Sequence, residues 1–234
     1  MLHLPKFVNI LENRVLWPQY IKSSKRLATP SKKTLKASEQ EREDRVKSRE
    51  EWQKFQTNVN ARHLIFLNES GLKTNMTRRY GRARGGQRCL DSAPCGHWET
   101  VTILSSMRLD GSTESLVSKG AVDRKMFDAY IKEVLGPTLC LGDIVVMDNL
   151  SAHKSQTAYG NIRAREAEVL FLPAYSPNFN PIEKMWSKIK QLLRDIKART
   201  EDELLTATGT ALATLTPSDA QGCFKSCGYT IYQS

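Results

Sequence analysis

The sequence predicts an α/β domain in which helices pack on a mixed β-sheet. Short runs of β-branched and aliphatic residues at 63–67 and 143–147 have the length and composition of buried strands. A long stretch after residue 180 instead carries apolar residues at helical spacing. Strands and helices in this order form sheets whose ligand-binding residues gather at strand ends.

The first half of this domain contains three predicted strands and one helix. The strands are expected at His63–Leu67, His97–Met107 and Glu114–Ser118. The helix is marked by apolar residues at helical spacing and ends before Gly136. These apolar residues are Met126, Phe127, Tyr130, Ile131 and Val134.

The second half contains two further strands and two helices. Asp143–Met147 is an apolar run, as expected of a strand covered on both faces, and Val169–Leu172 is a second short strand. The long helix begins at Pro181, and its apolar stripe indicates a surface that faces the core. A last helix is expected at about Glu201–Leu215, followed by an irregular tail. The stripe of the long helix consists of Ile182, Met185, Trp186, Ile189, Leu192, Leu193 and Ile196.

Residues 1–56 differ from the rest of the chain and are predicted to form a basic arm or linker before a domain at 57–234. Nine Lys or Arg residues lie between Lys22 and Lys47. Ser38–Phe55 is predicted to be a polar helix with few apolar residues. The charge suits either a solvated face or an arm that contacts DNA.

The composition indicates which kinds of molecule the protein binds and in which compartment it is found. The chain has 35 Lys and Arg residues against 25 Asp and Glu, which favours polyanionic partners because each bound phosphate releases counterions. No apolar run approaches the ~18 residues of a membrane span, and the N-terminus lacks the features of a signal peptide. The five cysteines form no CxxC pair and are expected to be reduced thiols. These features exclude the secreted and transmembrane classes and predict a cytoplasmic protein.

Two carboxylates stand at positions that suit catalysis. Asp148 directly follows the predicted strand 143–147, and Glu183 lies in the first turn of the long helix. Each also has a structural interpretation, Asp148 as a turn former and Glu183 as the acid of a capping box that begins at Asn180. Together, an acid at a strand end and an acid at a helix start suit the binding of Mg²⁺ ions for phosphodiester chemistry.

A third metal ligand would have to come from the central strand. The candidates directly follow the predicted strand 63–67, where Asn68 and Glu69 stand next to each other. The first of these positions holds an amide, and its neighbour is a carboxylate.

A basic segment at 73–88 contains six Lys or Arg residues, three glycines and no acid. It suits a segment that follows a DNA backbone with its Arg side chains on phosphates, although a solvated loop has the same composition. His153 is expected either to orient a phosphate or a water molecule or to be structural. The predicted DNA-binding residues are Lys73, Arg78, Arg79, Tyr80, Arg82, Arg84, Arg88, His153 and Lys154.

Taken together, four segments resemble the catalytic domain of Tc/mariner superfamily transposases, in particular the bacterial insertion-sequence branch. Thirty-four residues separate Asp148 from Glu183, which is the spacing of this branch. The resemblance extends from about Lys32 to Tyr229, and its last segment is the most specific part. The segments are LNESG (67–71), TRRYGRARGGQR (77–88), VVMDNLSAHK (145–154) and LPAYSPNFNPIEKMWSKIK (172–190).

The resemblance implies a ribonuclease-H-like fold and a triad of acids that binds two Mg²⁺ or Mn²⁺ ions. The implied reaction is cleavage of the transposon end by water, followed by attack of the freed 3′-hydroxyl on target DNA. Asp148 and Glu183 match the second and third acids, whereas Asn68 stands where the family has its first Asp. The amide removes one negative charge between two dications, so weak or no catalysis is predicted. Glu69 would replace it only if the strand ended or twisted there, because successive strand residues point to opposite faces.

The resemblance also implies double-stranded DNA as the partner, at the transposon ends and at the target. A homodimer is compatible with the sequence, which does not show whether the chain dimerises. Family members carry helix-turn-helix modules upstream, and residues 1–56 are too short for a pair of them. The expected function is transposition of an insertion sequence at the bacterial nucleoid, impaired by Asn68. Two alternatives stay open: a non-catalytic DNA-binding remnant or regulator, and a nuclease for RNA–DNA hybrids on the same fold.

Overall fold

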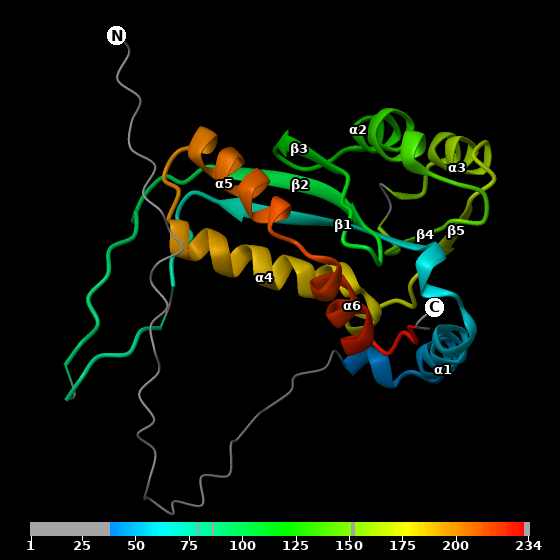
Figure 1. Cartoon of the computed structure of the whole chain (residues 1–234), viewed down its shortest axis with the longest axis horizontal. Coiled ribbons are helices and arrows are strands. Elements are labelled where there is room, and N and C mark those ends of the chain that lie inside the picture. The colour runs from blue at the N-terminus through cyan, green and yellow to red at the C-terminus, as the bar shows by residue number, and fades with distance from the viewer. Residues whose placement is uncertain (1–37, 79, 86, 151–152, 232–234) are drawn as a thin grey trace, which may run out of the picture. The chain divides into compact units, whose positions relative to one another are not determined.

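The computed structural model describes residues 38–78, 80–85, 87–150 and 153–231 (Figure 1). These residues all belong to one compact unit. Residues 1–37, which include most of the predicted basic arm, lie outside the described part of the chain.

The described residues form a mixed five-stranded sheet with the strand order β3-β2-β1-β4-β5. The central strand β1 pairs antiparallel with β2 and parallel with β4. The outer strands continue each pattern, since β3 is antiparallel to β2 and β5 is parallel to β4. The predicted mixed sheet is therefore confirmed. The strands are β1 (Leu64–Lys73), β2 (Thr100–Met107), β3 (Ser115–Lys119), β4 (Ile144–Met147) and β5 (Glu168–Phe171).

Helices cover both faces of this sheet. Within the described ranges they are α1 (Glu43–Asn58), α2 (Arg124–Ala129), α3 (Gln156–Arg163), α4 (Pro181–Ile196), α5 (Glu201–Ala213) and α6 (Pro217–Ser226). Leu64 and Phe66 of β1 pack with residues of α4, α5 and α6, whereas Ile65 and Leu67 pack with residues of α2 and α3. In Figure 1, α4 runs along one side of the sheet, and α2 and α3 lie on the other. None of the described helices is long and apolar enough to cross a membrane.

The apolar stripe of α4 faces the core at five of its positions, as its spacing predicted. The prediction is wrong for Ile196, which is 52% exposed. This residue ends the helix, and the next one, Lys197, adopts the left-handed conformation with φ 57°. The buried positions of the stripe are Ile182, Met185, Trp186, Ile189 and Leu193.

Strand β1 is longer than the sequence pattern predicted. It continues past Leu67 to Lys73, because its backbone pairs with β2 over the whole stretch from Phe66 to Lys73. Asn68 and Glu69 therefore lie inside the strand rather than after its end. The polar residues that broke the apolar pattern mark the point where β1 extends beyond β4.

Two helices were not expected from the sequence. The short helix α3 follows β4, and the tail predicted to be irregular contains α6. The start of α6 carries a clear local signal, since Thr216 and Asp219 form a capping box around Pro217 at the first helical position. The start of α3 is marked only by Ser155, whose hydroxyl accepts from the backbone N–H of Ala158.

Helix α1 coincides with most of the predicted polar helix and packs on the C-terminal segment. The indole N–H of Trp52 donates to the hydroxyl of Tyr229 at 3.1 Å, and the side chain of Gln56 donates to the Cys227 carbonyl at 2.8 Å. Both Trp52 and Gln56 are buried. The boundary expected after residue 56 thus falls inside a helix that belongs to the compact unit.

Candidate active site

A cavity of about 470 Å³ brings together the three residues that the sequence singled out as metal ligands. Asn68, Asp148 and Glu183 all line it, although they come from β1, from the end of β4 and from the start of α4. The segment 172–177 and the residue Arg45 of α1 complete much of its wall.

The pairing of β1 with β4 explains why Asn68 and Asp148 meet. The two strands are parallel, and Phe66 pairs with Val146. Continuing this register by two residues aligns Asn68 with Asp148. Side chains two residues apart share a face of a strand, so Asn68 points to the same side as Phe66, which is the side of α4.

Asn68 and Glu183 are joined directly. The side-chain amide of Asn68 donates from Nδ2 to Oε1 of Glu183 at 2.8 Å, across 115 positions of sequence. Asn68 is only 7% exposed. A hydrogen bond to a charged group contributes about 1.5–3 kcal/mol, and an amide can donate it where an ionised carboxylate cannot.

Glu183 does not act as the acid of a capping box in the structure. Asn180 occupies the N-cap position of α4, but its side chain makes no capping hydrogen bond. The side chain of Glu183 is engaged with Asn68 instead. Both residues line the cavity, so the start of this helix is turned toward the site.

Asp148 is held by His153, which also contacts Glu69 on the face of β1 opposite to Asn68. Nδ1 of His153 lies 2.7 Å from Asp148, and Nε2 of the same ring lies 3.1 Å from Glu69. Carboxylates only accept, so both ring nitrogens are donors in this arrangement. Burial opposes the charged ring, but the hydrogen bonds and negative charges of Asp148 and Glu69 outweigh it and raise the pKa of His153 to about 9. Asp148 also accepts from the backbone N–H of Leu150, so it forms the predicted turn as well.

This geometry does not support the expectation that His153 contacts DNA. Its side chain is fully buried, stacks on Phe127 with ring centroids 4.7 Å apart, and uses both nitrogens within the protein. Glu69 does not line the cavity, because it points to the opposite face from Asn68 and binds His153. A replacement of Asn68 by Glu69 as a ligand is therefore not favoured by the described geometry.

The predicted basic segment lies apart from the residues that line this cavity. Tyr80 is 92% exposed, and the ammonium group of Lys73 lies 5.7 Å from the ring centroid of Trp98. Arg78 pairs with Asp195 of α4, and Arg79 lies outside the described residues. The remaining predicted contacts are exposed, namely Arg82, Arg84, Arg88 and Lys154.

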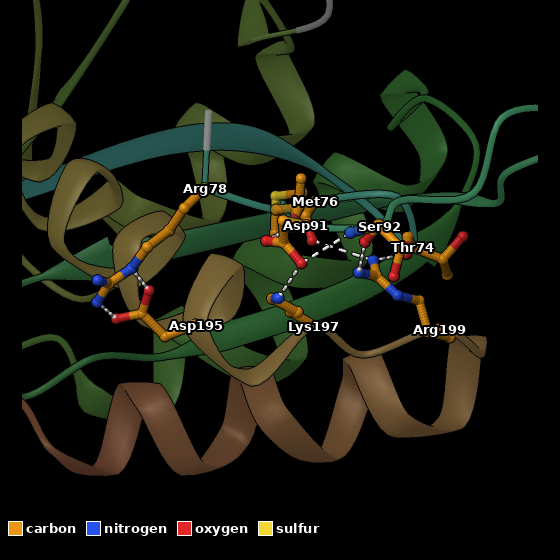
Figure 2. A network of polar contacts seen from close by, with 9 residues as sticks. Thr74, Met76, Arg78, Asp91, Ser92, Asp195, Lys197 and Arg199 are labelled. Atoms are coloured by element: carbon orange, nitrogen blue, oxygen red, sulfur yellow. Dashed lines mark hydrogen bonds and ion pairs between the residues drawn. The ribbon is translucent and has the colours of Figure 1, made fainter. Parts of the chain in front are cut away.

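The base of the loop between β1 and β2, which carries this basic segment, is anchored to the last turn of α4 and to the residues that follow it. Figure 2 shows Arg78 facing Asp195, and Lys197 facing Asp91. In the same view the guanidinium of Arg199 reaches the loop and donates to backbone carbonyls there. No short-range pattern marks Arg199, whose partners are more than 100 positions away in sequence. These acceptors are the carbonyls of Thr74, Met76 and Ser92, at 3.0, 3.1 and 3.5 Å.

Two residues of α1 belong to the site and were not singled out by the sequence. Arg45 lines the cavity. Arg49 donates to Ser176 at 2.5 Å and to Asn178 at 3.2 Å, and it lies 4.6 Å from the ring centroid of Phe179. Arg49 thus holds the proline-rich loop that leads into α4.

The ligand types in the cavity fit a hard divalent cation. The described part of the chain contains no group of three or more His, Cys, Asp and Glu side chains that could hold a metal. The cavity offers the carboxylates of Asp148 and Glu183 and the side-chain amides of Asn68, Asn149 and Asn180. Oxygen donors of this kind suit Mg²⁺ or Mn²⁺, but the negative charge is that of two acids rather than three.

Comparison with solved structures identifies the fold. The Mos1 transposase paired-end complex with the left transposon end superposes with a TM-score of 0.66 at 13% identity, over 90% of this chain and 64% of that chain. The Mos1 strand transfer complex gives 0.57 at 14% identity, over 92% and 68%. The Mos1 catalytic domain, solved with raltegravir and Mg, gives 0.53 at 12% identity, over 82% and 98%. These matches confirm the predicted ribonuclease-H-like fold.

The chain spans about two thirds of the length of the Mos1 transposase chain in the first of these complexes. A comparison with curated proteins gives no match. The family described as DDE superfamily endonuclease matches residues 63–205, which include β1, Asn68, Asp148 and Glu183. The chain therefore belongs to the DDE superfamily of endonucleases, and its fold is that of a mariner-type transposase catalytic domain.

Proposed function

We propose that this chain is the catalytic domain of a DNA transposase of bacterial insertion-sequence type, built for metal-dependent strand cleavage and strand transfer and impaired by Asn68. The observation that carries the proposal is the convergence of Asn68, Asp148 and Glu183 on one cavity. It supports these three residues as the positions of a catalytic triad. The family assignment supports phosphodiester chemistry as the reaction class.

Asp148 and Glu183 are the proposed anionic metal ligands, and Asn68 is the proposed neutral third ligand. Bound divalent ions would activate the attacking oxygen and stabilise the leaving oxygen. His153 keeps Asp148 oriented toward the site through its 2.7 Å hydrogen bond, and α4 delivers Glu183 on its first turn. The Mos1 catalytic domain with Mg supports the same class of cation here, and two ions remain the proposed number.

Asn68 is expected to lower activity through charge. Its amide leaves the site with two carboxylates and donates a hydrogen bond to one of them, Glu183. The pair formed by Asn68 and Glu183 is therefore stable without a cation, whereas an Asp at position 68 would face Glu183 with like charge. Loss of one key electrostatic contact commonly costs about 10²–10³ in rate.

The proposed partner is double-stranded DNA of the transposon ends and the target. Arg82, Arg84, Arg88 and Lys154 are exposed and available to phosphates. Lys73, Arg78, Arg79 and Tyr80 stay proposed contacts as well, although Arg78 would first have to leave Asp195. The proposed catalytic domain is 57–234, and the part of α1 before residue 57 packs onto it through Trp52 and Gln56.

A second function is favoured by the bond between Asn68 and Glu183. Because this bond stabilises the site without metal, the chain would also serve as a non-catalytic DNA-binding remnant or regulator. The two functions share the basic surface and differ only in whether the cavity supports cleavage.

Nicking of supercoiled plasmid in the presence of Mn²⁺ tests the proposal. The chain is compared with Asn68→Asp and with the double variant Asn68→Asp/Asp148→Asn, which keeps the restored first acid but lacks the second. Nicking by Asn68→Asp alone supports the triad and an impaired transposase. Equal nicking by all three forms contradicts the triad. Plasmid binding without nicking by any form supports the non-catalytic function.

A further inference from the structure

The start of α4 is built differently from the starts of the two helices that follow it. In α5, Thr200 and Glu203 form a complete capping box, and α6 is capped in the same way. Helix α4 has a similar sequence pattern, with Asn180 at the N-cap and Glu183 three residues later. However, the Asn180 side chain makes no capping hydrogen bond. The sequence of α4 therefore has the residues of a capping box, but the structure does not form one there.

Both polar side chains at this helix start are used elsewhere or left unpaired. Glu183 accepts a hydrogen bond from Asn68. Asn180 is 3% exposed, and its Oδ1 is buried without a hydrogen-bond partner among the described residues. Pro181 has no N–H and fixes φ for the first helical residue, so the helix start depends less on a side-chain cap.

An unpaired buried amide oxygen lowers stability, and native proteins keep few such atoms. Asn180 lines the same cavity as Asp148 and Glu183, whose ionised carboxylates only accept and cannot donate a hydrogen bond to it. Arg45 is the one cationic side chain among the described lining residues; its Nε lies 3.4 Å from Asp44 in an ion pair and makes no hydrogen bond to Asn180 or to any other described residue. The oxygens of Asp148, Glu183 and Asn180 are the kind of ligand that a hard cation binds.

We propose that Asn180 supplies its amide oxygen as a neutral ligand to a divalent cation held in this cavity with Asp148 and Glu183. This inference depends on the proposed function in one respect, namely that a divalent cation binds in the cavity. It explains how a site with two carboxylates completes its set of oxygen ligands. It also explains why Asn180 does not cap α4.

The affinity of the full chain for Mn²⁺ tests this role, measured from the electron paramagnetic resonance signal of the free ion. Asn180→Leu is expected to weaken binding on the order of 10-fold, the scale seen when one supporting group of a metal site is lost. Asn180→Asp keeps an oxygen ligand and is expected to bind at least as tightly as the unchanged chain. Gln191→Leu is the matched control on α4, because Gln191 is an exposed amide that does not line the cavity, and the affinity of this variant is expected to stay unchanged.

Stability without metal supplies a second readout. In EDTA, Asn180→Leu is expected to raise Tm by about 2–4 °C, because the unpaired oxygen is removed and no cap is lost. A structural role for Asn180 would instead lower Tm.

The outcomes separate this inference from the proposed function. Equal Mn²⁺ affinity of the unchanged chain and Asn180→Leu overturns the inference and leaves the proposed metal site intact. If only Asn68→Asp binds Mn²⁺ measurably, the Asn180 variants are compared in that background, with the same 10-fold loss expected. Absence of binding in every form overturns both. If Asn180→Leu does not fold, Asn180→Ala, which also lacks a side-chain oxygen, replaces it with the same expected loss.

Discussion

The side-chain amide of Asn68 donates a 2.8 Å hydrogen bond to Glu183, which ties the central strand to the first turn of α4. At this position an amide and a carboxylate attract each other without any bound ion. Two carboxylates would repel at the same place unless a cation lay between them. The identity of residue 68 therefore decides whether the site is stable when empty.

Replacing Asn68 with Asp is expected to lower the metal-free stability by about 1–3 kcal/mol, because the hydrogen bond is lost and like charges face each other. Thermal unfolding in EDTA measures this loss, and Mn²⁺ is expected to restore most of it. The double variant Asn68→Asp/Glu183→Gln is the control, since it again pairs one amide with one carboxylate and is expected to recover stability in EDTA. Equal metal-free stability of Asn68→Asp and the unchanged chain would show that the hydrogen bond between Asn68 and Glu183 does not stabilise the empty site.

Stability in the absence of metal is expected to fall as pH rises through about 9, because of His153. The pKa of this residue is raised to about 9 in the folded chain, above the ~6.5 of an unfolded histidine. A raised pKa contributes stability that is fully present below about pH 6.5 and is lost through pH 9. The loss is at most about 3 kcal/mol.

Urea unfolding at pH 6.5 and 9.5 checks this dependence, with EDTA present. His153→Gln is expected to lose the pH-dependent part of the stability, while His63→Gln, at an exposed histidine, keeps it. The same pH dependence in all three forms would show that other groups cause it.

Arg199→Ala is expected to loosen the base of the loop between β1 and β2. Arg199 donates hydrogen bonds to backbone carbonyls on both sides of that loop (Figure 2), and an alanine side chain has no donor with which to form them. Hydrogen exchange of the amides of Thr74 and Glu99 is expected to become about tenfold faster, since these residues form the last bonded pair before the loop. Arg165→Ala, at an exposed arginine outside this network, serves as the control. Unchanged exchange in Arg199→Ala would show that the strand pairing alone holds the loop.

Arg49→Ala is expected to cost about 1–2 kcal/mol of stability, because two hydrogen bonds and a cation–π contact to the proline-rich loop are lost. Urea unfolding measures the change. Arg42→Ala on the same end of the chain removes an exposed ion pair with Asp44 and is expected to change stability by less than about 0.5 kcal/mol. If the two variants lose equal stability, Arg49 does not hold the loop.

Local sequence determined most of the secondary structure. The apolar run 143–147, the helical stripe after Pro181 and the positions of the other strands along the chain each follow from patterns over a few residues, and the structure has the corresponding elements. The extent of β1 does not follow from such a pattern, because the stretch from Asn68 to Lys73 is held by pairing with β2. The tail at 217–226 shows the opposite case, since Thr216, Pro217 and Asp219 form a local capping signal for a helix there.

The sequence by itself also indicated that Asn68, Asp148 and Glu183 form a group, because strand ends and helix starts gather at one edge of a mixed sheet. Only the tertiary structure decided what each side chain does there. The burial of His153 between Asp148 and Glu69, the bond from Asn68 to Glu183 and the uncapped start of α4 join residues that come from different elements. Such contacts depend on how the elements pack, and no periodicity along the chain encodes them.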